Sequence, residues 1–100
     1  MSIKDLAQTI AARKNSNPDT SWTAKLLNNP DKAAEKFGEE AIEAIIEATK
    51  GNKSRLVAEA ADVLYHLLVM CAAHDVTFDD IEMELASRSA QSGLTEKANR

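Results

Sequence analysis

The chain contains little cysteine, glycine, proline or aromatic residue. Its 100 residues include one Cys, three Gly, two Pro and four aromatic side chains. A single cysteine excludes a disulfide within the chain and is typical of proteins from a reducing compartment, so Cys71 is interpreted as a small core residue. The scarcity of glycine and proline argues against a fold built on β-turns. With 44% hydrophobic residues but few rings, the composition predicts helices that pack through Ala, Leu, Ile and Val.

The chain also lacks a strongly basic segment and a long hydrophobic run. The net charge is −4, and no cluster of Lys and Arg is interleaved with aromatic residues, which argues against a nucleic-acid partner. The longest apolar run, residues 67–73, is far shorter than the ~20 residues that span a bilayer, and the first ten residues hold no hydrophobic signal core. We therefore expect a cytoplasmic protein without a membrane partner. The length predicts one domain over residues 1–100, with a small and polar flexible tail from about residue 88 to residue 100.

Apolar residues recur at helical spacing through most of the chain, which predicts an all-α fold with four to five helices. The predicted helices cover about residues 2–14, 21–29, 31–50 and 53–73, with a last helix that starts after Thr77 and fades between 87 and 93. The residues expected to cap the helix starts are Ser2, Ser21 or Thr23, Asp31 and Thr77. Gly51 marks the turn between the two longest helices.

The third predicted helix has a recognisable apolar face. This face is expected to consist of Ala34, Phe37, Ala41, Ile45 and Ala48, widened by Ile42 and Ile46. Its acids and Lys36 are expected on the other side. Gly38 lies inside this helix, where it costs about 1 kcal/mol relative to Ala, so either a close approach of another helix or ligand, or simple tolerance, has to explain it.

Five acids stand at helical spacing within the two longest predicted helices. Glu40 and Glu43 are three residues apart, as are Glu59 and Asp62, so each pair projects from one face of its helix, and Glu39 precedes the first pair. The segment 56–73 is otherwise almost entirely apolar, which predicts that its helix is buried. Buried carboxylates are costly unless they are paired, protonated or bound to a metal. If the two helices pack antiparallel, the acids converge and a divalent cation would relieve their repulsion.

Carboxylates without a cysteine or a suitably spaced histidine predict a site for a hard cation. Mg²⁺ is the expected ion, with Mn²⁺ as a possible substitute, because Mg²⁺ accepts a few carboxylates and completes its shell with water or phosphate oxygens. This favours a phosphate-bearing substrate. A di-iron site needs Glu-x-x-His pairs, which are missing here since Asp62 and Val63 occupy the relevant positions. A solvated helix face without metal remains the alternative, and it suits Glu35, Glu47 and Glu39 better than the acids of the apolar helix.

The chain resembles a known family at these residues. The pattern Glu-Glu-x-x-Glu, followed after a spacer by Glu-x-x-Asp, is the signature of the all-α, MazG-like nucleoside triphosphate pyrophosphohydrolases. The surrounding sequence is similar to one branch, the phosphoribosyl-ATP pyrophosphohydrolases of histidine biosynthesis. The segments that carry this likeness are SWT at 21–23, KFGEEAIE at 36–43, EAADVLYHLLV at 59–69 and SGLTEKANR at 92–100. One departure is Trp22, where the branch more usually has Tyr.

The resemblance implies hydrolysis of 1-(5-phosphoribosyl)-ATP to 1-(5-phosphoribosyl)-AMP and pyrophosphate, the second step of histidine biosynthesis. It implies that Glu40, Glu43, Glu59 and Asp62 ligate Mg²⁺. Glu39 is then a further ligand or the catalytic acceptor of the attacking water's proton. The implied fold is a helical bundle in which the hairpin of the two long helices pairs with that of a second copy, so that a homodimer completes a core four-helix bundle.

Several polar residues near the acids are candidates for binding the substrate or supporting the site. Those proposed to contact its phosphates or other polar groups are Lys36, Lys32, Arg13, Lys14, Ser21 and Thr23. The lysines are otherwise solvated charges, and Ser21 and Thr23 are otherwise helix caps. His66 lies four residues after Asp62 on the same face. It is interpreted either as a hydrogen-bond partner that orients the metal ligands or as a hydrogen-bonded core histidine.

Three functions are therefore considered. The first is the histidine-pathway pyrophosphohydrolase. The second is a house-cleaning pyrophosphatase of the same superfamily that acts on a deoxynucleoside triphosphate such as dUTP, for which the chain is poor in aromatic residues to stack the base. The third is a non-catalytic helical interaction module whose acids serve solubility.

Overall fold

The computed structural model describes residues 1–89, and these residues form helices and loops without a strand. The five helices are α1 (Ile3–Ala12), α2 (Trp22–Leu27), α3 (Pro30–Lys50), α4 (Lys53–Ala72) and α5 (Phe78–Arg88). The predicted all-α fold is thus confirmed, with helix bounds close to the expected ones. The prediction of a flexible tail falls mostly on residues 90–100, outside the described part of the chain.

The helix starts follow from local hydrogen bonds. Ser2 and Thr77 each accept from the backbone N–H three residues on, and the carboxylates of Asp5 and Asp80 accept from the cap backbone, so both predicted caps are confirmed and each forms a capping box. Of the two candidates for α2, Ser21 is the cap, since its Oγ accepts from the Ala24 N–H at 3.1 Å.

The start of α3 differs from the prediction. Its cap is Asn29, whose side chain accepts from the Lys32 N–H at 3.2 Å, and not Asp31. Pro30 occupies the first position of the helix, where its missing N–H costs nothing and its fixed φ suits the helix, so α3 begins one residue before the expected cap. Asp31 lies in the first turn, where its charge favours the helix dipole.

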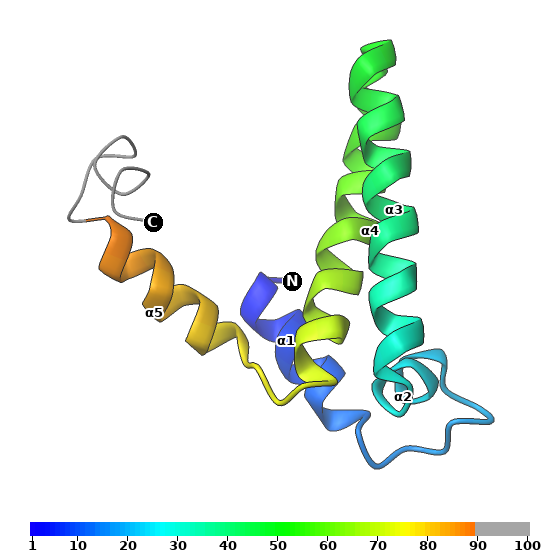
Figure 1. Cartoon of the computed structure of the whole chain (residues 1–100), viewed down its shortest axis with the longest axis vertical. Coiled ribbons are helices and arrows are strands. Elements are labelled where there is room, and N and C mark those ends of the chain that lie inside the picture. Colours follow the sequence, from blue (N-terminus) through cyan, green and yellow to red (C-terminus); the bar gives the residue numbers. More distant parts are fainter. Residues whose placement is uncertain (90–100) are drawn as a thin grey trace.

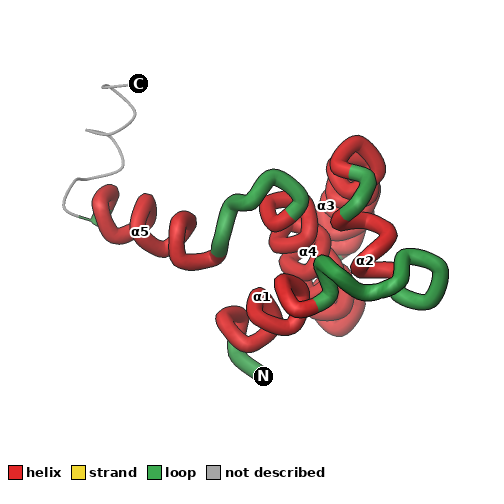
Figure 2. The backbone as a smooth tube through the Cα atoms, turned by 90° about the horizontal axis from the view of Figure 1, so that it is seen from below, coloured by secondary structure: helices red, strands yellow, loops and turns green. Residues whose placement is uncertain are grey.

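The hairpin of α3 and α4 dominates the molecule. Gly51 ends α3 with a left-handed φ of 72°, and Asn52 at once caps α4, so the chain reverses within two residues. Figure 1 shows the two helices side by side along their length, with α1 and α2 gathered at the end far from this turn. Both views show α5 running away from the hairpin (Figures 1 and 2), and within residues 1–89 it has no extensive contact with another helix.

The core lies where α1 and α2 meet the hairpin. Its buried hydrophobic residues are Ile10, Ala24, Leu26, Ala33, Leu68 and Val69. Phe78, at the start of α5, packs against the edge of this cluster. Because the core is confined to one end, the other half of the hairpin has no further helix of the described chain to cover it.

Two expectations about burial are not met within the single described chain. The predicted apolar face of α3 is mostly exposed, with Ile42 at 59% and Ile45 at 63%, whereas the face toward α4 carries Glu40 and Glu47. The helix α4 is not buried all round, since Val57 in its first half is 65% exposed. The physical reason is that α1 and α2 reach only the second half of α4, and a helical pattern identifies an apolar stripe without identifying its neighbour.

Two smaller points concern Gly38 and membranes. A Cβ added at Gly38 meets nothing within 4 Å, so no other helix of the described chain explains this glycine by close approach. None of the helices in residues 1–89 combines the length and the hydrophobicity needed to span a membrane.

Candidate metal centre and substrate site

Three carboxylates from the two hairpin helices meet in the middle of the hairpin. Glu40 and Glu43 of α3 and Glu59 of α4 each offer a ligand oxygen, and these oxygens all lie within 4.8 Å of one another. They meet because the turn is tight: Glu43 lies eight residues before Gly51 and Glu59 seven residues after Asn52, at similar heights in an antiparallel pair. Oxygens on opposite sides of a magnesium ion are about 4.2 Å apart. Small side-chain rotations would therefore bring this acidic cluster onto one divalent cation, which suits the donor set of hard oxygen ligands.

Asp62 lies one helical turn beyond Glu59 and outside this group of three. It is exposed, but its negative charge helps to raise the pKa of Glu40, which places it in the same electrostatic environment. Burial is the largest cause of the raised Glu40 pKa, followed by the hydrogen bond and charge of Glu43. His66 acts in the opposite direction and lowers the Glu40 pKa. Burial and the neighbouring carboxylates therefore disfavour the ionised form of Glu40, and a bound cation would offset this repulsion.

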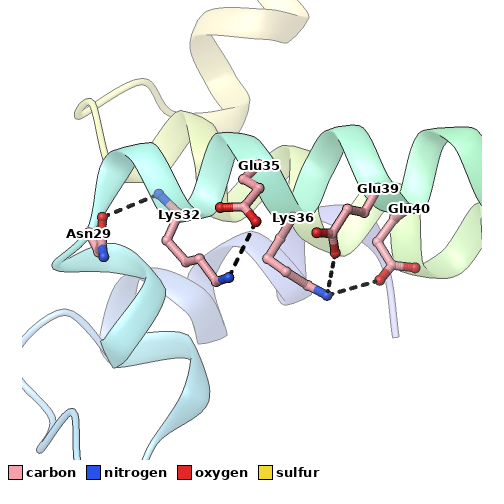
Figure 3. A network of polar contacts seen from close by, with 6 residues as sticks. All are labelled: Asn29, Lys32, Glu35, Lys36, Glu39 and Glu40. Carbon is pink, nitrogen blue, oxygen red and sulfur yellow. Dashed lines mark hydrogen bonds and ion pairs between the residues drawn. The ribbon is translucent and has the colours of Figure 1, made fainter.

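Lys36 forms an ion pair with one member of the cluster. Figure 3 shows its Nζ between two carboxylates, 3.0 Å from Glu39 and 3.7 Å from Glu40. The hydrogen bond with Glu39 is the main cause that raises the pKa of Lys36 and lowers the pKa of Glu39. The ion pair with Glu40 does not outweigh burial and Glu43, since the pKa of Glu40 stays raised. Lys36 is thus not a freely solvated charge, and Glu39 lies beside the cluster instead of inside it.

Comparison with known proteins shows the family of the chain. Residues 3–89 match the sequence profile of a family described as phosphoribosyl-ATP pyrophosphohydrolase. The chain belongs to this family. A protein of Jannaschia sp. (strain CCS1) named phosphoribosyl-ATP pyrophosphatase is 67% identical over 99 residues, which are 98% of this chain and 97% of that one. Proteins of the same name from Ruegeria pomeroyi and Paracoccus denitrificans are each 66% identical, covering 98% and 95% of this chain and 94% and 89% of their own lengths.

Two segments that carried the family resemblance touch in the structure. Thr23 of the SWT segment and Tyr65 of α4 share a hydrogen bond between their hydroxyl groups. Tyr65 in turn meets the ring of its neighbour His66 edge to face, with the ring centroids 4.9 Å apart. Thr23 is therefore a link between α2 and α4, and the interpretation of Thr23 as a helix cap is wrong. Ser21 caps α2, which confirms the interpretation of Ser21 as a helix cap.

Unpartnered buried atoms mark the interface between α3 and α4. Among the described residues, the buried side-chain nitrogen and oxygen atoms without a hydrogen-bond partner are Glu47 Oε2, Glu59 Oε2 and His66 Nε2. Buried polar atoms in native proteins are nearly always satisfied, so such atoms are expected where a ligand, ion or water binds. All three belong to the hairpin: Glu47 is in α3, and Glu59 and His66 are in α4.

Glu47 was missed as a buried residue. The sequence interpretation placed it on a solvated face, but it is only 7% exposed, and it forms an ion pair with Lys50 at 3.7 Å. The signal was present in the spacing, because Glu47 follows Glu43 by four residues and Glu40 by seven and so shares their face.

The remaining lysine and arginine candidates lie elsewhere. Lys32 is paired with Glu35 at 3.5 Å, one turn before Lys36 (Figure 3). Lys14 forms an ion pair of 2.7 Å with Asp75 and lines a cavity of about 390 Å³ between α1, the end of α4 and the start of α5. Arg13 caps the C-terminal end of α1. The structure therefore does not bring Lys14 together with the acidic cluster by any direct contact.

Proposed function

We infer that this chain hydrolyses 1-(5-phosphoribosyl)-ATP to 1-(5-phosphoribosyl)-AMP and pyrophosphate, as the second step of histidine biosynthesis. The family match and the relatives, which cover nearly the whole chain, support this reaction. The single observation of the structure that carries it is the convergence of Glu40, Glu43 and Glu59 within 4.8 Å across the hairpin. A pyrophosphohydrolase needs such a cluster because its substrate and products carry several negative charges. The carboxylates hold a cation, and the cation neutralises the phosphates that would otherwise be repelled by them.

We propose Mg²⁺ as the cation, with Mn²⁺ as its substitute, and Glu40, Glu43, Glu59 and Asp62 as its protein ligands. A cation held there supplies charge neutralisation of the phosphates and lowers the pKa of a bound water. The raised pKa of Glu40, caused first by burial and then by Glu43, and the unpartnered Oε2 of Glu59 support this assignment, since the first describes crowded carboxylates and the second a buried oxygen without a hydrogen-bond donor. Asp62 joins by a side-chain rotation from its exposed position one turn along α4.

Lys36 and Glu39 act as a pair in this proposal. Lys36 Nζ lies at the edge of the cluster, where it can exchange its carboxylate partners for a phosphate oxygen of the substrate. The hydrogen bond from Lys36 is the main cause of the lowered Glu39 pKa, so its transfer to phosphate raises that pKa again. Glu39 then becomes the better proton acceptor at the moment when the substrate is bound. This would make proton removal from the attacking water depend on the correct placement of the phosphates.

The other substrate contacts stay predictions. Lys32 extends the positive edge of α3 by one turn, and Ser21 lies at the start of α2. Thr23 has its hydroxyl engaged by Tyr65, and Lys14 is engaged by Asp75, so each must exchange a partner to bind the ligand. Arg13, at the end of α1, has the weakest support from the geometry.

A homodimer is the form in which we propose that the enzyme works. The exposed large hydrophobic residues of the hairpin are Ile42, Ile45, Ile46, Val57 and Leu64. In α3 they recur at spacings of three and four and in α4 at a spacing of seven, so each helix presents one apolar stripe. A second hairpin covers both stripes and completes a four-helix bundle, and apolar exposure on this scale is otherwise rare on a monomer.

The experiment that tests the function is pyrophosphate release with Mg²⁺ from four substrates at equal concentration: phosphoribosyl-ATP, ATP, dUTP and dCTP. We expect strong preference for phosphoribosyl-ATP and loss of release when EDTA replaces Mg²⁺. Preference for a deoxynucleotide would assign the chain to the house-cleaning pyrophosphatases instead. A folded protein that is silent on every substrate would contradict any catalytic role.

A further inference from the structure

His66 is a buried histidine with one ring nitrogen engaged and the other not. It is 7% exposed, and its Nδ1 lies 2.7 Å from the backbone carbonyl oxygen of Asp62. A carbonyl oxygen only accepts hydrogen bonds, so the proton of the ring is on Nδ1. The other nitrogen, Nε2, is buried and has no hydrogen-bond partner among the described residues. In the neutral ring with its proton on Nδ1, Nε2 carries a lone pair and can accept a hydrogen bond from a donor.

The placement of this nitrogen connects it with the acidic cluster. Glu59, Asp62 and His66 follow at spacings of three and four, so the three residues share one face of α4. The bond of Nδ1 to the Asp62 backbone also ties the ring to the helix turn that carries this proposed ligand. The side chains of the cluster are carboxylates, which accept hydrogen bonds when ionised and so cannot supply the donor that Nε2 lacks. Neither the cluster nor another described residue supplies the donor that Nε2 lacks.

We propose that His66 is a positioning residue of the metal site: its Nε2 accepts a hydrogen bond from a water molecule that enters the acidic cluster together with the cation. The bond from Nδ1 to the Asp62 carbonyl fixes the tautomer and holds the ring to the helix turn that carries Asp62. This proposal rests on the proposed function, because it takes the acidic cluster to be the metal site. It differs from a purely structural role, in which the Asp62 bond and burial explain the residue completely and Nε2 meets nothing.

The chain is well suited to a direct test, because it contains only two histidines. In a His74→Asn variant, His66 is the sole histidine, and two-bond ¹H–¹⁵N correlation spectra of ¹⁵N-histidine-labelled protein report the protonation of each ring nitrogen. We expect Nδ1 to be protonated and Nε2 unprotonated with and without Mg²⁺. Addition of Mg²⁺ alone should move the Nε2 resonance toward that of a hydrogen-bonded acceptor and leave Nδ1 almost unchanged.

Each other result of the spectra overturns part of the reasoning. A protonated Nε2, or an Nε2 that does not respond although Mg²⁺ raises the melting temperature, contradicts the role of His66 and leaves the metal site intact. If Mg²⁺ changes neither the melting temperature nor any resonance, the metal site itself is wrong and this proposal fails with it.

A matched pair of variants separates the two ring nitrogens in the enzyme assay. His66→Asn places its amide near Nδ1 and can keep the bond to the Asp62 carbonyl, whereas His66→Gln places its amide near Nε2 and supplies an acceptor there. We expect His66→Asn to lower kcat by about 10- to 100-fold with little change in KM, the usual range for residues behind metal ligands, and His66→Gln to regain part of this loss. The opposite order, with His66→Asn near the wild-type rate, would show that only the structural bond matters. Circular dichroism checks that both variants are helical, and the spectra above use unaltered His66, so they decide the question even if both variants unfold.

Discussion

Glu40→Gln should make the metal-free protein more stable and the metal-loaded protein less stable than wild type. The substitution removes one negative charge from a group of three carboxylates and keeps the shape of the side chain, which is only 12% exposed. It also removes an ion pair to Lys36 at 3.7 Å, but Lys36 retains Glu39 at 3.0 Å. The gain from relieved repulsion should therefore exceed the loss.

The magnitude follows from the separation of the ligand oxygens. Two unit charges 4.8 Å apart repel by about 1 kcal/mol in water and by about 3 kcal/mol at an effective dielectric constant of ~20. Because Glu43 is exposed, the lower figure is the better guide, and we expect Glu40→Gln to raise the free energy of unfolding in EDTA by about 1 kcal/mol. This corresponds to a melting temperature about 2–8 °C higher, the smaller shift applying if two chains unfold as one unit.

Adding the cation should reverse the order of the two proteins. A cation at a hundred times its Kd stabilises the wild-type fold by about 2.7 kcal/mol, because it binds only the folded state. Glu40→Gln loses a ligand and gains little, so wild type should then be the more stable by about 1–2 kcal/mol. Melting curves in EDTA and in millimolar Mg²⁺ measure both differences. The control is Glu35→Gln, which makes the same charge change on an exposed part of α3 beside Lys32 and should alter neither curve.

The advantage of Glu40→Gln in EDTA should also depend on pH. A carboxyl group whose folded-state pKa is raised binds more protons in the folded state, so its contribution to stability is present at low pH and is lost as the pH rises through the raised pKa. Below the ordinary pKa of 4.5, Glu40 is protonated in both states and the two proteins should melt alike. The reasoning is refuted if Glu40→Gln melts below wild type in EDTA at neutral pH, or if Mg²⁺ raises both melting temperatures equally.

Three further predictions concern the site, the interface and the core. Asp62→Asn should reduce pyrophosphate release at least tenfold with the helical circular dichroism unchanged, whereas Asp31→Asn, at the exposed start of α3, should retain the wild-type rate; equal rates would remove Asp62 from the ligand set. Ile45→Glu places a charge in the exposed apolar stripe of α3 and should shift the sedimentation of the protein from dimer to monomer, while Met83→Glu on α5 should leave it unchanged. Leu26→Ala empties a fully buried position between α2 and the hairpin and should lower the free energy of unfolding by about 2–5 kcal/mol in urea titrations; a loss below 1 kcal/mol would contradict the assignment of the core.

The sequence predicted the helices well because their boundaries depend on local chemistry. Capping boxes at Ser2 and Thr77 and the left-handed turn at Gly51 involve residues within four positions of one another. The pairing of Glu40 with Glu59 was also predictable, since a tight turn between two long helices brings residues at similar distances from the turn into register.

The remainder of the site depends on which helix covers which face, and a helical pattern does not contain that information. The spacing of Glu47 shows that it shares a face with Glu40 and Glu43, but not that α4 covers this face and buries Glu47. The bond between Thr23 and Tyr65 joins positions 42 residues apart, and no local rule predicts it. For the same reason Lys14, which precedes a loop and was expected to face the substrate, is found with Asp75 at the other end of α4.

The hairpin has its polar and apolar sides placed as a bound cation and a second copy would require. Between α3 and α4 lie the unpartnered oxygens of Glu47 and Glu59, whereas the isoleucines of α3 face outward. A pair of helices that buries carboxylates and exposes isoleucines gains little from its own association, because burial of apolar area is the main favourable contribution to folding and unpaired buried charge opposes it. A cation would neutralise the carboxylates between the two helices, and a second hairpin would cover the exposed isoleucines. The proposed metal and the proposed dimer are therefore linked through the same two helices, and loss of either should weaken the other.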